Sequence, residues 1–343
     1  MALTDIWFLL IAVLWTGYFV LEGFDFGVGM LLRVLSRDNT DRRVLINTIG
    51  PVWDGNEVWL LVAGGATFAA FPLWYANLFS GFYLALLVIL VALIVRGVAF
   101  EFRGKFDSDR WRRGWDVAII VGSAVPALLW GVAFGNIVRG VPLDADHHFT
   151  GDFFTLLNPY ALLGGLTTLT VFAFHGAVFV ALKTEGEVRA RAKALTVPLG
   201  GAAVVVGAAF LLRTQVAYGA DWTWVSVVVA AGALVTAVLM ARVRREGWAF
   251  AGTALTIVAT TVTLFGSLYP DVLPASNDAA NSLTTTNASS TPYTLEIMTW
   301  VAVFFTPVVL AYQAWTYWVF RKRVSRAHIP ASQGLMAEQR QVS

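Results

Sequence analysis

The 343-residue sequence contains no cysteine, which excludes disulfides, thiolate metal sites, iron–sulfur clusters and thiol nucleophiles. It is also poor in charge. Asp, Glu, Lys and Arg make up 13 % of the residues, against about 25 % in ordinary soluble domains. A soluble protein of this length needs more charge than this to cover its surface. The composition therefore excludes a disordered chain, a collagen and a nucleic-acid-binding protein.

Apolar residues make up 57 % of the chain, and its mean hydropathy is +0.67. A bilayer core about 30 Å thick requires roughly 20 apolar residues per helix. We therefore predict an all-α integral membrane protein with nine spans, at about 6–32, 51–71, 78–100, 115–138, 160–182, 195–212, 222–241, 248–268 and 297–320. Residues 1–323 would form one transmembrane domain, and 324–343 a polar tail. The second span is the least regular, because Asp54 and Glu57 lie in its first turns.

Every second loop is nearly free of basic residues. Of the 24 Lys and Arg, all but Arg139 and Arg213 lie in or beside the other set of loops, those that follow the first, third, fifth and seventh spans, or in the tail. The positive-inside rule then places the N-terminus outside and the C-terminus in the cytoplasm. Residues 269–295 contain no Lys or Arg and are rich in Ser, Thr, Asn and Pro, which predicts an extended external loop.

Histidine is scarce, with four in the chain and only His175 inside a predicted span. A buried haem requires His, Met or Cys as its axial ligand. One histidine cannot hold two or three haems. We expect His175 to be a core residue with its hydrogen bonds satisfied.

Two acids, Glu22 and Asp25, lie inside the first predicted span, three residues apart and therefore on one helix face. Two acids this close should not both ionise easily in a low dielectric. This arrangement suits a proton relay. The alternative is an ion pair with a basic neighbour such as Arg96. Gly23 and Gly27, four residues apart, predict close packing of this helix against another.

Three further acids lie near the same predicted cytoplasmic side. Asp54 and Glu57 open the second span, where acids are also favoured simply by the helix dipole. Glu101 stands between two phenylalanines at the end of the third span, where an ion pair with Arg103 or Lys105 is the alternative to a functional role. The later spans contain no comparable acids. The cluster as a whole indicates entry of protons or cations from the cytoplasm.

Several ordered segments resemble subunit II of the cytochrome bd-type quinol oxidases. They include GFDFGVGML from Gly23 to Leu31, WDGNEVWL from Trp53 to Leu60, FEFRGKF from Phe100 to Phe106, and NPYALLGG after Leu157. The resemblance runs in order over nearly the whole chain. It implies two four-helix bundles and a peripheral helix, in a bacterial cell membrane.

The resemblance also implies an activity: a complex that oxidises quinol, reduces dioxygen to water and builds a proton-motive force. Haems b558, b595 and d would lie in a partner, subunit I, and small single-helix accessory subunits and membrane lipids can join such complexes. Acidic residues of subunit II are implicated in proton delivery in this family, and the resemblance implies that role here for Asp25, Asp54 and Glu101. Some members hold a quinone or a lipid in subunit II, but no motif in this sequence specifies one.

We therefore predict the haem-free subunit of a terminal oxidase, not catalytic by itself. Asp54 and Glu101 would collect protons, and Asp25, with Glu22 and Glu57 in secondary roles, would pass them inward. Two alternatives remain at this stage. One is an ion-coupled secondary transporter, which the one-sided acid cluster and the odd number of spans disfavour. The other is a structural membrane scaffold in which the acids are merely paired.

Overall fold

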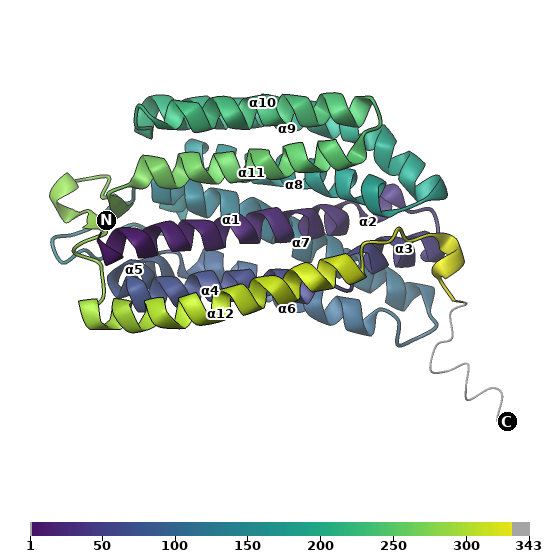
Figure 1. The fold of residues 1–343 in the computed structure, drawn as a ribbon, viewed down its shortest axis with the longest axis horizontal. Coiled ribbons are helices and arrows are strands. Elements are labelled where there is room, and N and C mark those ends of the chain that lie inside the picture. The colour runs from purple at the N-terminus through teal and green to yellow at the C-terminus, as the bar shows by residue number, and fades with distance from the viewer. Residues whose placement is uncertain (1, 331–343) are drawn as a thin grey trace.

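The computed structural model describes residues 2–330, and long helices aligned along one axis make up most of them (Figure 1). The α-helices are α1 (Leu3–Met30), α2 (Leu32–Leu35), α3 (Asn39–Ile49), α4 (Trp53–Ala70), α5 (Pro72–Gly81), α6 (Tyr83–Phe102), α7 (Asp109–Arg139), α8 (Pro159–Lys183), α9 (Gly186–Tyr218), α10 (Thr223–Arg242), α11 (Glu246–Leu268) and α12 (Pro292–Val319). Two short strands, β1 (Asp271–Leu273) and β2 (Leu283–Thr284), pair antiparallel. Single 3-10 turns lie at Phe154–Leu156, Ala279–Asn281 and Arg326–His328.

Within the described residues, 8 helices are long and apolar enough to span a membrane. They are α1 and α6 to α12. Helix α4, the expected second span, has 18 residues but is not among them. Its first turns carry Asp54, Asn56 and Glu57, which lower its hydropathy. The count of nine spans and the orientation therefore stay predictions.

The helices pack in two neighbouring sets. Helices α1, α4, α6 and α7 form one set, and α8 to α11 form the other, with α8 also packed against α1 and α7. The approach of α1 to α8 depends on glycine: a Cβ built on Gly27 would lie 2.7 Å from the Cα of Gly176. A Cβ on Gly23 would meet the ring of Phe172 at 2.8 Å, so the close packing predicted for both glycines is confirmed. Helix α12 lies along α1 and α4, with only Leu295 buried.

Some helix boundaries differ from those of the predicted spans. The expected span 78–100 is interrupted at Phe82, between α5 and α6. The expected span 195–212 is the inner part of α9, which begins at Gly186. In its first turns, Arg189 and Lys193 pair with Glu246 of α11. The loop at 269–295 is not simply extended, since it contains the β1–β2 pair. It is also tied to the 140–149 loop, where Asn277 Nδ2 donates to the Leu143 carbonyl at 2.8 Å.

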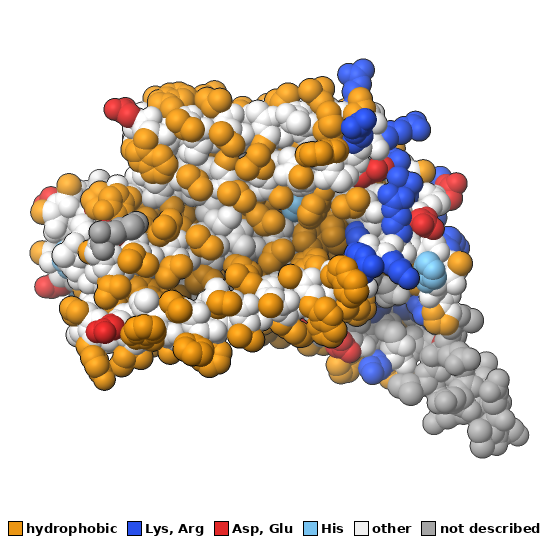
Figure 2. Space-filling view, viewed as in Figure 1, with side chains coloured by type: hydrophobic (Ala, Val, Ile, Leu, Met, Phe, Trp, Pro, Cys, Tyr) orange, Lys and Arg blue, Asp and Glu red, His pale blue; other side chains and the backbone are white. Residues whose placement is uncertain are grey.

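Charge is distributed unevenly over the molecule. On the face drawn in Figure 2, the sides of the helices are largely apolar, and the Lys and Arg side chains gather at the end where α3 and the C-terminal segment lie. This end carries the loops in which the sequence concentrates its basic residues. The acids discussed below belong to the same end of the first helix set.

Candidate functional site: a buried acid cluster

One arginine stands at the centre of a buried group of acids. Arg96 of α6 is 0 % exposed and pairs with Glu22 of α1, also 0 % exposed, through its Nη1. The same Nη1 lies 3.7 Å from Oε1 of Glu57 on α4. The guanidinium carbon is 4.8 Å from the ring centre of Phe26 and 5.4 Å from that of Phe100. Three helices and two aromatic faces therefore fix the position of this cation.

Asp25 lies one turn from Glu22 and is 0 % exposed. Its Oδ2 accepts a hydrogen bond of 2.7 Å from Nδ2 of Asn56 on α4. Its Oδ1 has no hydrogen-bond donor among the described residues. Asn56 is itself fully buried, and its Oδ1 accepts from the hydroxyl of Tyr317 on α12 at 2.7 Å. The cluster therefore extends from α1 through α4 to the peripheral helix.

The two outer acids lie at the surface beside this cluster. Asp54 begins α4 and Glu101 ends α6, and both are exposed. Their sequence neighbours Trp53 and Phe100 pack together with ring centres 5.0 Å apart, so the two acids occupy adjacent helix ends. Arg103, an expected partner of Glu101, instead donates to Asp116 through its Nε at 2.6 Å.

These positions define a charge imbalance. Glu22, Asp25 and Glu57 surround a single cation, Arg96, and two of the three acids are completely buried. Holding several ionised carboxylates around one guanidinium in a low dielectric is costly. The group can lower this cost by binding protons. The arrangement suits acids that gain and lose protons rather than acids held permanently ionised.

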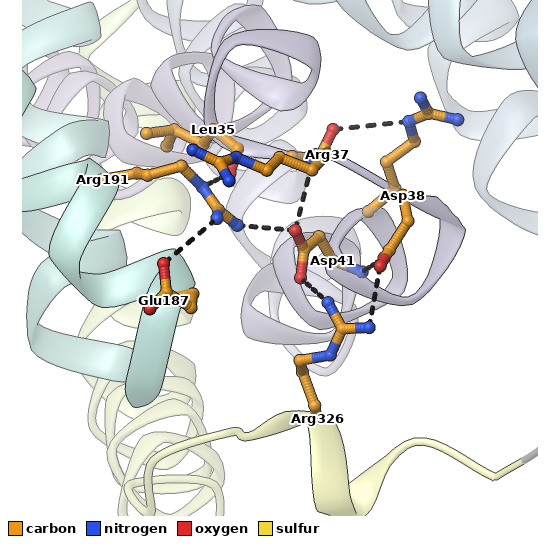
Figure 3. A network of polar contacts seen from close by, with 9 residues as sticks. Leu35, Arg37, Asp38, Asp41, Glu187, Arg191 and Arg326 are labelled. Atoms are coloured by element: carbon orange, nitrogen blue, oxygen red, sulfur yellow. Dashed lines mark hydrogen bonds and ion pairs between the residues drawn. The ribbon is translucent and has the colours of Figure 1, made fainter.

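A second polar cluster, drawn in Figure 3, lies at the basic end and has the opposite character. Asp41 of α3 is 1 % exposed and accepts from the backbone N–H of Arg37 at 3.0 Å, from Arg191 of α9 at 2.6 Å, and from Arg326 at 2.6 Å. Arg326 also donates to Asp38 at 2.7 Å. The hydrogen bond from the Asp41 backbone N–H, together with Arg326, holds the pKa of Asp38 below its usual range. This cluster ties the segment after α12 to α3 and α9.

His175 of α8, the one histidine inside a predicted span, has polar contacts on both ring nitrogens. Its Nδ1 is 2.6 Å from the Thr253 hydroxyl and its Nε2 is 3.1 Å from the Val20 carbonyl. Its ring stacks on Phe250 with centres 4.6 Å apart. Both ring nitrogens are engaged and the ring is covered, so this residue does not fit an axial haem ligand. The prediction of a satisfied core histidine is confirmed.

Comparison with known proteins identifies the family. The model of the family described as cytochrome bd terminal oxidase subunit II matches residues 3–320. The chain belongs to this family. The curated relatives include cytochrome bd ubiquinol oxidase subunit 2 of Bacillus subtilis, 43 % identical over 331 residues, with 94 % of this chain and 97 % of the relative covered. They also include cytochrome bd-I ubiquinol oxidase subunit 2 of Escherichia coli K12, 40 % identical, with 94 % of this chain and 96 % of the relative covered.

The fold is also that of a solved member of the bd oxidases. A chain in the structure of bd oxidase from Geobacillus thermodenitrificans superimposes with a TM-score of 0.76, covering 93 % of this chain and 97 % of that chain at 18 % identity. Together with the membrane-length helices, membership of the subunit II family confirms a multi-pass protein of the bacterial cytoplasmic membrane. The family resemblance noted in the sequence is confirmed as well.

The structure unites only part of the predicted site. It brings Glu22, Asp25 and Glu57 together around Arg96, and it leaves Asp54 and Glu101 exposed at the adjacent surface. Sequence reasoning missed Asn56, although it stands between two of the predicted acids. It also missed the polar pair on α12, Gln313 and Tyr317. Their spacing of four residues within an apolar helix places them on one face, and this was a usable signal for a buried polar contact.

Proposed function

We propose that this chain is the haem-free subunit of a bd-type terminal oxidase that oxidises quinol and reduces dioxygen to water. It would assemble with and stabilise a haem-bearing subunit I, which supplies the redox chemistry. The names of the B. subtilis and E. coli relatives, ubiquinol oxidase subunits, support this activity. The engaged and covered state of His175 supports the placing of the haems in the partner.

We further propose that the acid cluster supplies protons taken up from the cytoplasm. Reduction of dioxygen to water consumes protons, and a path from the cytoplasm makes that consumption contribute to the proton-motive force. Exposed Asp54 and Glu101 would collect protons. Asp25, with Glu22 and Glu57 beside it, would hold them and release them toward the partner subunit. The observation that carries this proposal is three acids grouped around one arginine.

Asp25→Asn tests the proposal in the assembled complex. The substitution keeps the size of the side chain but removes the titrating group. We expect the rate of quinol-dependent oxygen consumption to fall about 100-fold or more, the scale on which loss of a positioned proton-transfer group acts. Haem content, read from the reduced-minus-oxidised spectrum, should stay unchanged. Asp54→Asn should lower turnover less, because Glu101 lies at the adjacent helix end and can also collect protons.

Glu296→Gln is the matched control, because it removes an exposed acid near the start of α12, in the first turns rather than near Tyr317. Full turnover of Asp25→Asn at normal haem content would refute a proton-carrying role for Asp25. Normal turnover in every acid variant would favour the scaffold. Substrate-dependent uptake into proteoliposomes by this chain alone would favour the transporter.

A further inference from the structure

The hydrogen bonds that reach Asp25 from α12 run in one fixed direction. The series begins at Trp59, whose indole Nε1–H donates to Oε1 of Gln313 at 2.8 Å. An indole nitrogen can only donate a hydrogen bond. Gln313 must therefore direct its oxygen toward Trp59 and its amide nitrogen toward Asn56, one turn earlier on the same helix, α4. That nitrogen lies 3.4 Å from Oδ1 of Asn56.

The orientation of Asn56 follows from these contacts. Its Oδ1 receives hydrogen bonds from Gln313 and from the hydroxyl of Tyr317, the latter at 2.7 Å. With its oxygen occupied on the α12 side, its amide nitrogen faces Asp25 and donates to Oδ2 at 2.7 Å. The reversed amide would present an oxygen to Asp25 and two hydrogens to the donors on α12. Trp59, Gln313 and Tyr317 together disfavour that arrangement.

We propose that Asn56, oriented by Gln313 and Tyr317 of α12, is a positioning residue that sets the proton affinity of Asp25. A donor directed at a carboxyl group stabilises the ionised carboxylate, whereas an acceptor stabilises the protonated acid. The donor held toward Asp25 works against protonation, so the orientation of Asn56 affects how readily this acid takes up and releases a proton. This inference rests on the proposed proton-carrying role of Asp25 and adds the group that tunes it.

The burial of the contact makes it effective. Asn56 and Asp25 are both 0 % exposed, so water does not compete for the hydrogen bond, and a bond in such surroundings is stronger than one in water. Helix α12, by contrast, is exposed along most of its length. A change in how α12 packs would therefore be transmitted from Gln313 and Tyr317 to Asn56, and from Asn56 to Asp25.

Other charged or titratable groups act on Asp25 or lie on the helices packed around it, and they must stay constant in the test. They are Glu22 on α1, Glu57 on α4, Arg96 on α6, Asp116 on α7, which is paired with Arg42 and Arg103, and His175 on α8, whose ring nitrogens contact Thr253 and Val20. Within residues 2–330, none of these groups is hydrogen-bonded to the side chain of Gln313 or Tyr317. Substitutions on α12 therefore alter the orientation of Asn56 without altering these charges, apart from the Tyr317 hydroxyl itself.

The test follows the carboxyl group of Asp25 by infrared difference spectroscopy during a pH titration of the assembled oxidase complex. The carbonyl band of the protonated acid is assigned by its loss in Asp25→Asn. In the double variant Tyr317→Phe with Gln313→Leu, we expect this band to persist to a pH about one unit higher, a tenfold change in proton affinity. Tyr317→Phe and Trp59→Phe alone should give smaller shifts in the same direction. Tyr312→Phe, which changes an exposed tyrosine on the same helix, should give none.

The single variants retain aromatic packing, so they keep the proposal testable if the double variant fails to assemble. A band that titrates at the same pH in Tyr317→Phe, Trp59→Phe and the unsubstituted complex would overturn the inference. A shift of equal size in Tyr312→Phe would overturn it as well. This readout is independent of turnover. Failure of the proposed function appears instead as full oxygen consumption in Asp25→Asn.

Discussion

Asp25 and Asp41 are both buried aspartates in helices near the basic end of the molecule, yet their surroundings differ in kind. Asp41 has donors on both oxygens, two of them arginine side chains from segments distant in sequence. Asp25 has one neutral donor, and its Oδ1 has none among residues 2–330. Burial alone therefore does not distinguish an acid that holds the fold together from an acid that exchanges protons.

The number and charge of the partners make that distinction. A carboxylate surrounded by guanidinium groups stays ionised, because charge-assisted hydrogen bonds offset the cost of removing its charge from water. A carboxyl group with a single amide donor and two neighbouring acids gains by binding a proton. The first arrangement binds segments together and the second leaves the acid free to change its charge. Substitutions in the two clusters should therefore act on different properties.

The largest effect on stability is expected at Arg96, the buried cation beside Glu22 and Glu57. Arg96→Met keeps the length of the side chain and removes the charge, leaving Glu22 buried without its partner. Breaking a buried ion pair from one side costs about 3–5 kcal/mol. Protonation of Glu22 then limits the loss. We expect a lower thermal midpoint of the assembled complex and a loss of turnover.

The double variant Arg96→Met with Glu22→Gln separates pairing from packing. It removes both charges, so it should recover much of the stability lost in Arg96→Met while turnover stays low. A double variant as unstable as Arg96→Met would show that Arg96 acts through its packing against Phe26 and Phe100. The instability of Arg96→Met would then arise from lost packing and not from lost charge.

Asp41→Asn should have the next largest effect on stability and little effect on turnover. The amide cannot satisfy Arg191 and Arg326 together, and it turns two hydrogens toward groups that are themselves donors. Leaving such groups unpaired costs about 1–3 kcal/mol. Arg326 is half exposed and can turn to water, which reduces the penalty. Thermal unfolding of the complex and its oxygen consumption measure the two expectations together, and a turnover loss as large as that of Asp25→Asn would contradict them.

Much of the fold and part of the buried acid cluster could be predicted from the sequence. Hydropathy located eight of the helices, and the rarity of acids within apolar segments singled out Glu22 and Asp25. Arg96 was a predictable partner because it lies at the same expected depth. The polar contacts of α12 were harder to predict, since Gln313 and Tyr317 meet Asn56 only through packing of helices distant in sequence. The cluster around Asp41 was not predicted, because residues 33–50 lie between the first two expected spans and no helix was expected there, although Asp38 is a recognisable N-cap for α3.

The smallest expected effect lies at Asp38 and concerns acid pH. Hydrogen bonds from the Asp41 backbone N–H and from Arg326 lower the pKa of Asp38 in the folded state. At pH values above the ordinary aspartate range, Asp38 therefore stabilises the attachment of the segment after α12 to α3. This contribution is lost as the pH falls from about 4 through the lowered folded value. We therefore expect hydrogen exchange in residues 320–330 to show increased opening toward acid pH, after correction for the intrinsic exchange rate.

Arg326→Gln should bring the same opening to neutral pH, since it removes the partner shared by Asp38 and Asp41. Lys322→Gln is the matched control. It makes the same change of charge four residues away, and the Lys322 side chain forms no ion pair within residues 2–330. Equal opening in both variants would mean that general charge, rather than the two aspartates, holds the segment. Opening confined to Arg326→Gln, with oxygen consumption unchanged, would show that the cluster around Asp41 fastens the segment after α12 and that turnover does not depend on this cluster.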